Sequence, residues 1–211
     1  MSQSINHKRL YGPDLARFIA FVGMIHVNYK YMMGADALTH PINAAISLIQ
    51  GRAAGLFAIV AGLGLGLFYN NNNYSYVKRL ILRRSFLLFL IGSINMIFFE
   101  ADIIHYYAIY FLIGLIALRL SNTKIVALIL LLNIIFIILL DLIDYSQDWN
   151  FDKLIYTELW TLDGYFRNLI YNGFHPVIPW SAFLLFGIIL SRLDLTNRIL
   201  QNRYLSIGLA I

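Results

Sequence analysis

Three histidines lie in, or at the edge of, polar stretches between apolar runs, where their side chains could take part in proton transfer. His105 closely follows Glu100 and Asp102, and His40 and His175 lie in two other such stretches. Imidazole accepts a proton near neutral pH, so this set of residues is typical of general acid–base chemistry. Solvated loop side chains are the competing interpretation. A metal site is not expected, because the sequence has neither cysteine nor an HxH or HxxxH spacing.

A second set of polar residues lies inside apolar runs, where each charge costs at least roughly 2.5 kcal/mol and therefore indicates a function. Asp14 lies three residues before Arg17, so the two share a helix face and can pair, either to fix the helix in a bundle or to line a site. Asn28 falls within roughly 20° of Arg17 around a helix, whereas His26 lies about 180° away, which favours a structural histidine facing another helix. Arg52 is a further charged residue inside an apolar run.

The elements that position these residues are expected to be helices that cross a membrane. Apolar residues make up 60% of the 211 positions and charged residues 13%, whereas soluble domains have about 45–50% and about 25%. We therefore expect an all-α integral membrane protein: a single transmembrane domain over residues 1–211, with six transmembrane helices plus a partial seventh in a polytopic bundle. The spans are expected at about 15–33, 44–69, 80–99, 103–118, 125–143 and 177–193, with the partial one from 204. That last run reaches residue 211 before it is long enough to cross, which indicates a short or truncated member of a longer family.

The distribution of Lys and Arg predicts the orientation, because cytoplasmic flanks are enriched in them. With the N-terminus in the cytoplasm, Lys30, Lys153 and Arg167 are the basic residues left outside. Residues 144–176 then form an extracytoplasmic loop, which contains His175 and lies on the same side of the membrane as His40 and His105. Its aromatic residues suit a membrane surface, so we expect an interfacial helix at about 151–170 that acts as a partial lid. The expected location is the bacterial plasma membrane.

Small residues form a stripe in the second apolar run. Ala54, Ala58, Gly62 and Gly66 recur at every fourth position, which allows two helices to approach closely. We interpret the stripe as a packing surface, with a ligand path lined by backbone as the alternative.

Several motifs resemble those of one membrane-protein family. Residues 14–20 read DLARFIA and continue with Met24 and with VNY at 27–29, which resembles the D-x-x-R-G-x-A, M and V-N-Y pattern of the heparan-alpha-glucosaminide N-acetyltransferase-like (DUF1624) proteins. Phe18 replaces the usual glycine. Further similar stretches are FAIVAG at 57–62 and PVIPW at 176–180 with Gly187. The Arg83-Arg84 pair, Gly92 and ADIIHYYA at 101–108 are similar to a signature of the related DUF418 family.

This resemblance implies a membrane-bound acyltransferase that moves an acetyl group from cytosolic acetyl-CoA to an extracytoplasmic sugar or glycan. The family has a histidine in the outer loop after its first helix, and His40 occupies the matching region. We therefore expect His40 to act as base or nucleophile and Asn28 to orient the acyl carbonyl. Asp102 and His105 are expected to orient the base or the acceptor.

Acetyl-CoA is expected to bind at Arg17, together with Asp14 and Arg52. About 16 Å of helix separates Arg17 from Asn28, a distance that an extended pantetheine arm can bridge. The alternative function is a small-solute transporter or a noncatalytic membrane protein, in which these charged residues and Asn95 line a path. The expected partners are the lipid bilayer, a sugar or glycan acceptor and a second copy of the chain. Nucleic acid is not expected, because no Lys/Arg cluster stands apart from the apolar runs.

Overall fold

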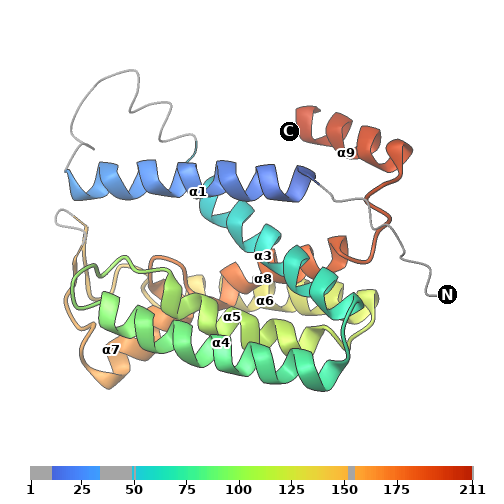
Figure 1. The fold of residues 1–211 in the computed structure, drawn as a ribbon. Coiled ribbons are helices and arrows are strands. Elements are labelled where there is room, and N and C mark those ends of the chain that lie inside the picture. The colour runs from blue at the N-terminus through green and yellow to red at the C-terminus, as the bar shows by residue number, and fades with distance from the viewer. Residues whose placement is uncertain (1–10, 34–48, 50, 152–154, 211) are drawn as a thin grey trace.

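The structure is a computed structural model that describes residues 11–33, 49, 51–151 and 155–210, and nearly all of its regular elements are helices (Figure 1). The helices are α1 (Tyr11–Met32), α3 (Arg52–Asn70), α4 (Tyr74–Asn95), α5 (Ile104–Ala117), α6 (Asn122–Leu142), α7 (Leu162–Arg167), the π-helix η2 (Asn168–Asn172), α8 (Val177–Leu190) and α9 (Arg198–Ala210). Two short strands, β1 (Trp149–Asn150) and β2 (Ile155–Tyr156), form an antiparallel pair. The prediction of a mainly helical chain is confirmed, apart from this pair of strands.

Two of these helices, α3 and α6, are long and apolar enough to cross a bilayer. A third candidate is the pair Leu162–Asn172 and Val177–Leu190, which bends by 43°, if the two parts form one span. Helix α5 is apolar, but its 14 residues extend over about 21 Å, less than the roughly 30 Å hydrocarbon core. Helix α4 carries four Lys or Arg residues. The described residues thus contain two or three candidate spans, and the six spans, the partial seventh and the cytoplasmic N-terminus stay predictions.

Helix α6 is the clearest sign of a lipid environment. Its sequence is almost entirely Leu, Ile, Val, Ala and Phe between Lys124 and Asp141, yet Ile125 is its one buried residue. A helix that exposes apolar side chains around its circumference is stable in hydrocarbon rather than in water. The fold therefore agrees with an integral membrane protein.

Helices α3 and α8 form the closest contact of the bundle. A Cβ atom added to Gly62 would overlap the backbone carbonyl of Leu184, and one added to Gly187 would overlap the backbone carbonyl of Ile59. Glycine lets the two backbones touch at these points. The interpretation of the small-residue stripe as a packing surface is therefore confirmed.

The other helices surround this contact. Helix α4 packs along α5, while α5 and α6 both pack against α8. Helix α1 packs mainly on α3, and α9 lies near the N-terminal end of α1 (Figure 1). The core between α3, α5 and α8 includes the buried rings of Tyr106, Tyr107 and Tyr110.

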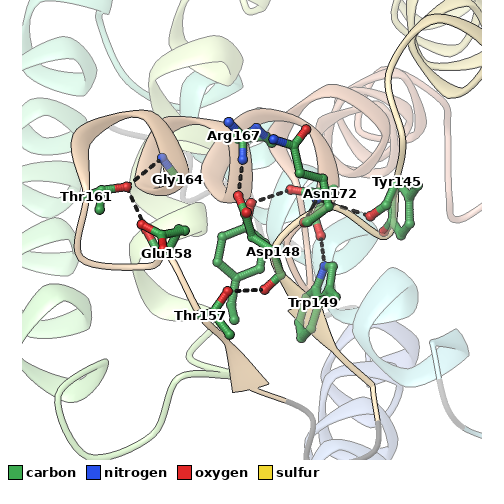
Figure 2. A network of polar contacts seen from close by, with 11 residues as sticks. Tyr145, Asp148, Trp149, Thr157, Glu158, Thr161, Gly164, Arg167 and Asn172 are labelled. Carbon is green, nitrogen blue, oxygen red and sulfur yellow. Dashed lines mark hydrogen bonds and ion pairs between the residues drawn. The ribbon is translucent and has the colours of Figure 1, made fainter.

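The connection between α6 and α8 is organised around Asn172, whose side chain is fully buried (Figure 2). Its Nδ2 donates to the carbonyl oxygens of Tyr145 at 3.1 Å and Gln147 at 3.0 Å. Its Oδ1 accepts from the hydroxyl of Tyr156 at 2.9 Å, and its backbone carbonyl accepts from Nε1 of Trp149 at 2.6 Å. Because one residue bonds to both strands and to the residues before them, the connection has a fixed shape.

A second set of contacts in this connection involves Asp148, whose φ of 67° lies in the left-handed region. Its carboxylate pairs with the guanidinium of Arg167, and its backbone carbonyl accepts from the hydroxyl of Thr157 at 3.1 Å (Figure 2). The same carbonyl also accepts from the backbone amide of Thr157 at 2.8 Å. Asp tolerates this conformation better than most residues, and here its contacts hold the chain in it.

The helix predicted at about 151–170 is wrong in its extent. In the part of this segment that the structure describes, helix begins only at Leu162, after the strand pair. The hydroxyl of Thr161 accepts from the amide of Gly164 at 3.1 Å, which caps the helix at that point. Of the aromatic residues that indicated one long helix, Trp149 and Tyr156 instead lie on the strands, pack against each other and bond to Asn172.

Candidate active site

A large cavity of about 630 Å³ lies between α1, α3, α4 and α5. Its wall is mostly apolar, and two arginines, Arg17 from α1 and Arg84 from α4, supply positive charge. Apolar lining residues include Phe57, Leu65, Phe68, Leu88, Ile103 and Phe111. A long apolar space with guanidinium groups in its wall suits a ligand that has an anionic group and an extended body.

Arg17 is held between its own helix and α3. Its Nη1 lies 3.5 Å from Oδ1 of Asp14, so the predicted pair forms. A methyl group on Gly64 would lie 3.5 Å from Nη2 of Arg17, which places the guanidinium beside α3. The side chain of Arg17 is 50% exposed, so its donors remain accessible to a second anion.

A smaller cavity of about 190 Å³ lies at the other end of α1. Its polar lining comes from Asn28 on α1 and His175 just before α8, and its aromatic lining comes from Phe174 and Trp180. Ile103 lines both cavities, so the two spaces adjoin at this residue. The larger cavity thus adjoins a space that is lined by an amide, an imidazole and an indole.

His175 is fixed in its place by neighbours on three elements. The hydroxyl of Tyr110 donates to the carbonyl oxygen of His175 at 2.5 Å. The Trp180 ring packs edge-on at 4.6 Å between ring centroids, and the Tyr106 ring lies at 6.3 Å. The backbone ahead of it is held where the amide of Gly173 donates to the carbonyl of Asn168 at 2.9 Å.

Asp102 and His105, which were expected to orient the base or the acceptor, form a buried pair with each other. The His105 Nδ1 lies 2.9 Å from Oδ2 of Asp102, and both side chains are 1% exposed. The same carboxylate accepts from the backbone amide of His105 at 3.0 Å, and its Oδ1 accepts from Nδ2 of Asn95 at 2.7 Å. Burial raises the pKa of Asp102, but the hydrogen bonds from His105 and Asn95 lower it more, so the net pKa lies below its usual value.

This pair does not line either cavity. Its neighbours Ala101 and Ile103 do, so Asp102 fixes the corner between α4 and α5 that separates the two spaces. Gly92 allows this corner to form, because a Cβ there would overlap the backbone of His105. The geometry makes the pair a support of the cavity wall.

Two other residues considered in the sequence, Arg52 and His26, lie away from these cavities. Arg52 is exposed at the first residue of α3 and is absent from both linings. His26 is exposed, and its Nδ1 lies 2.8 Å from the carbonyl oxygen of Val22, so it bonds to its own helix instead of packing against another. His40 lies outside the described residues. Within the described chain, no three His, Asp or Glu side chains are grouped to hold a metal ion.

Two cavity residues were not assigned a site role from the sequence. Arg84 was interpreted as a topology signal, although it lies ten residues into α4, about 15 Å from the helix start. His175 was grouped with the outer histidines as a possible general acid or base and was not selected as a site residue. The sequence feature that could have identified His175 is its position directly before the PVIPW motif, which begins α8.

Comparison with known proteins identifies the family. No curated protein and no solved structure matches the chain. Residues 9–207 match the family described as heparan-alpha-glucosaminide N-acetyltransferase, catalytic. Because this match covers nearly the whole sequence, the chain belongs to the catalytic family of heparan-alpha-glucosaminide N-acetyltransferase.

Proposed function

We propose that this protein transfers an acetyl group from cytosolic acetyl-CoA to a sugar or glycan on the outer side of a bacterial plasma membrane. Family membership implies a membrane acetyltransferase-like activity and the general use of acetyl-CoA. The observation that carries the proposal is the pair of adjoining cavities, one with arginines and an apolar wall, the other with Asn28, His175 and Trp180.

The larger cavity is the proposed donor site. Phosphate groups of CoA bind guanidinium through charge-assisted hydrogen bonds, for which Arg17 and Arg84 are suited. The apolar wall accommodates the pantetheine arm, which extends toward Ile103. Arg17 and Asn28 are separated by about 16 Å along α1, so an extended arm brings the thioester to the smaller cavity.

The smaller cavity is the proposed place of reaction. The acceptor amine or hydroxyl attacks the thioester carbonyl carbon, so that a C–N or C–O bond forms and the C–S bond breaks. The acceptor proton passes to a base, and the CoA thiolate takes up a proton. His40 is the base that the family resemblance implies, and in the sequence it lies between Asn28 and Gly51, which both line this cavity. Asn28 donates to the carbonyl oxygen as negative charge develops on it.

The orientation is part of the proposal. Six spans with a partial seventh and a cytoplasmic N-terminus would direct the Arg17 end of α1 toward the cytoplasm, where acetyl-CoA is made. The Asn28 end would then face outward, next to the connection over residues 144–176. The positive-inside distribution of Lys and Arg supports this orientation.

Isothermal titration of CoA into detergent-purified protein tests the donor site. Arg17→Ala and Arg84→Ala are each expected to weaken binding by about tenfold, roughly 1.4 kcal/mol, because each removes a charge-assisted hydrogen bond. Arg83→Ala is the matched control, since Arg83 is exposed and absent from the cavity lining.

Equal affinities of the Arg17, Arg84 and Arg83 variants would contradict the donor site. Failure of the wild type to bind CoA, together with solute uptake into proteoliposomes without an acyl donor, would instead favour the transporter.

A further inference from the structure

The imidazole of His175 has one buried ring nitrogen, and the residue lines the smaller cavity. Its Nδ1 is buried and has no hydrogen-bond partner within the described chain. The residue nevertheless lines the cavity together with Asn28, and Nε2 is not among the buried atoms without a partner, so Nε2 is the ring nitrogen left for a ligand there. Buried polar atoms without a partner are rare in native proteins, and their positions require an explanation.

The burial of Nδ1 determines which ring nitrogen carries the proton in the neutral form of His175. A buried N–H without an acceptor is rarer than an acceptor without a donor, so the neutral tautomer places the proton on Nε2. A second proton on Nδ1 would create a buried charged N–H with no acceptor, which is costly. His175 is therefore suited to donate a hydrogen bond from Nε2 and is poorly suited to accept a proton.

We propose that His175 is a second hydrogen-bond donor, beside Asn28, to the acyl carbonyl oxygen in the transition state. This inference rests on the proposed function and adds a residue to it. As the acceptor attacks the carbonyl carbon and the C–S bond breaks, negative charge on the oxygen is shared by two neutral donors. The acceptor proton goes to a different base, and His175 keeps its own proton throughout.

The surroundings of His175 support such a role. A donor must be held in place before charge develops, because the gain is lost if the site must reorganise. The Tyr110 hydroxyl fixes the His175 backbone, and the Trp180 indole packs against the ring. Neither contact occupies Nε2.

The test compares His175→Gln with His175→Leu in acetyl transfer from acetyl-CoA to glucosamine by detergent-purified protein. Gln retains an N–H donor, so its kcat is expected to fall less than tenfold. Leu has no donor, so its kcat is expected to fall about 10²–10³-fold, while the KM for acetyl-CoA stays within about twofold. His175→Met replaces the Leu variant if CoA titration shows that Leu has lost the fold.

Infrared difference spectra of bound acetyl-CoA labelled with ¹³C at the carbonyl provide a second readout. The carbonyl stretch is expected at lower wavenumber in the wild type and the Gln variant than in the Leu variant, because a hydrogen bond weakens the C=O bond. Equal losses of kcat in Gln and Leu, or an unchanged band in Leu, would overturn the role of His175 alone. Absence of transfer by the wild type would overturn the proposed function and this inference with it.

Discussion

At the scale of single residues, the spacing in the sequence indicates which side chains can pair better than it indicates where each pair lies in the fold. The three-residue spacing of Asp14 and Arg17 and of Asp102 and His105 is enough to bring each pair together on a helix or its first turn. The sequence could not show that Asp102 and His105 lie behind the cavity wall, because this depends on how α4 meets α5. The sequence likewise placed His175 in a polar stretch but could not predict that its Nδ1 is buried without a partner. That burial results from packing against residues distant in the sequence.

Asp102→Asn is expected to lower stability in a pH-dependent way. The folded pKa of Asp102 is lowered, so ionised Asp102 stabilises the folded state above the unfolded pKa of about 3.9. That contribution is lost as the pH falls through the folded pKa. At pH 7 the variant should lose roughly 1.5–3 kcal/mol, because the bonds from His105 and Asn95 are made to a charged group.

Melting temperatures in detergent, followed by tryptophan fluorescence, measure this effect. The difference between wild type and Asp102→Asn should be large at pH 7 and should shrink as the pH falls below about 4. Asp163→Asn, which alters an exposed acid in α7, is the control and should change stability by less than about 0.5 kcal/mol. A difference that stays constant with pH would contradict this account of Asp102.

At the scale of elements, apolar runs predicted where helices lie, and local polar chemistry decided where they begin. Helix α4 begins at Tyr74 instead of about residue 80, because the Asn73 side chain accepts from the amide of Tyr76 at 2.9 Å and caps it. The connection around Asn172 could not be predicted, since its shape depends on partners up to 27 residues away. Close helix packing was predictable, because small residues at every fourth position have few other uses in a span.

Gly62→Ala and Gly64→Ala are expected to have opposite effects, although they lie two residues apart in α3. The new methyl group at Gly62 would overlap the Leu184 carbonyl, so α3 and α8 must separate at a cost of about 1–3 kcal/mol. At Gly64 it would meet only Nη2 of Arg17 at 3.5 Å, an ordinary contact, while helix propensity favours Ala by about 1 kcal/mol.

Melting temperatures of the two variants in the same detergent, with circular dichroism to confirm helical content, give the comparison. Gly62→Ala should melt below the wild type, and Gly64→Ala at or above it. The reverse order would mean that α3 and α8 do not meet at Gly62.

At the scale of the whole molecule, the arrangement of charge and cavities follows the long axis of α1. Arg17 lies near one end beside the larger cavity, and Asn28 lies near the other end beside the smaller one. The sequence predicted the membrane environment from composition and predicted these two residues on one face from their spacing. It could not predict that Ile103 would line both cavities, because that depends on how α4 meets α5.

The central claim is that acetyl groups cross from one side of the membrane to the other. Inverted membrane vesicles loaded with glucosamine and given [1-¹⁴C]acetyl-CoA outside test it most directly, with vesicles lacking the protein as the background. We expect labelled N-acetylglucosamine inside the vesicles, with the rate reduced by about 10²-fold in Asn28→Ala, which removes a donor to the carbonyl oxygen. Label that stays outside, or no labelled sugar above background, would contradict the account.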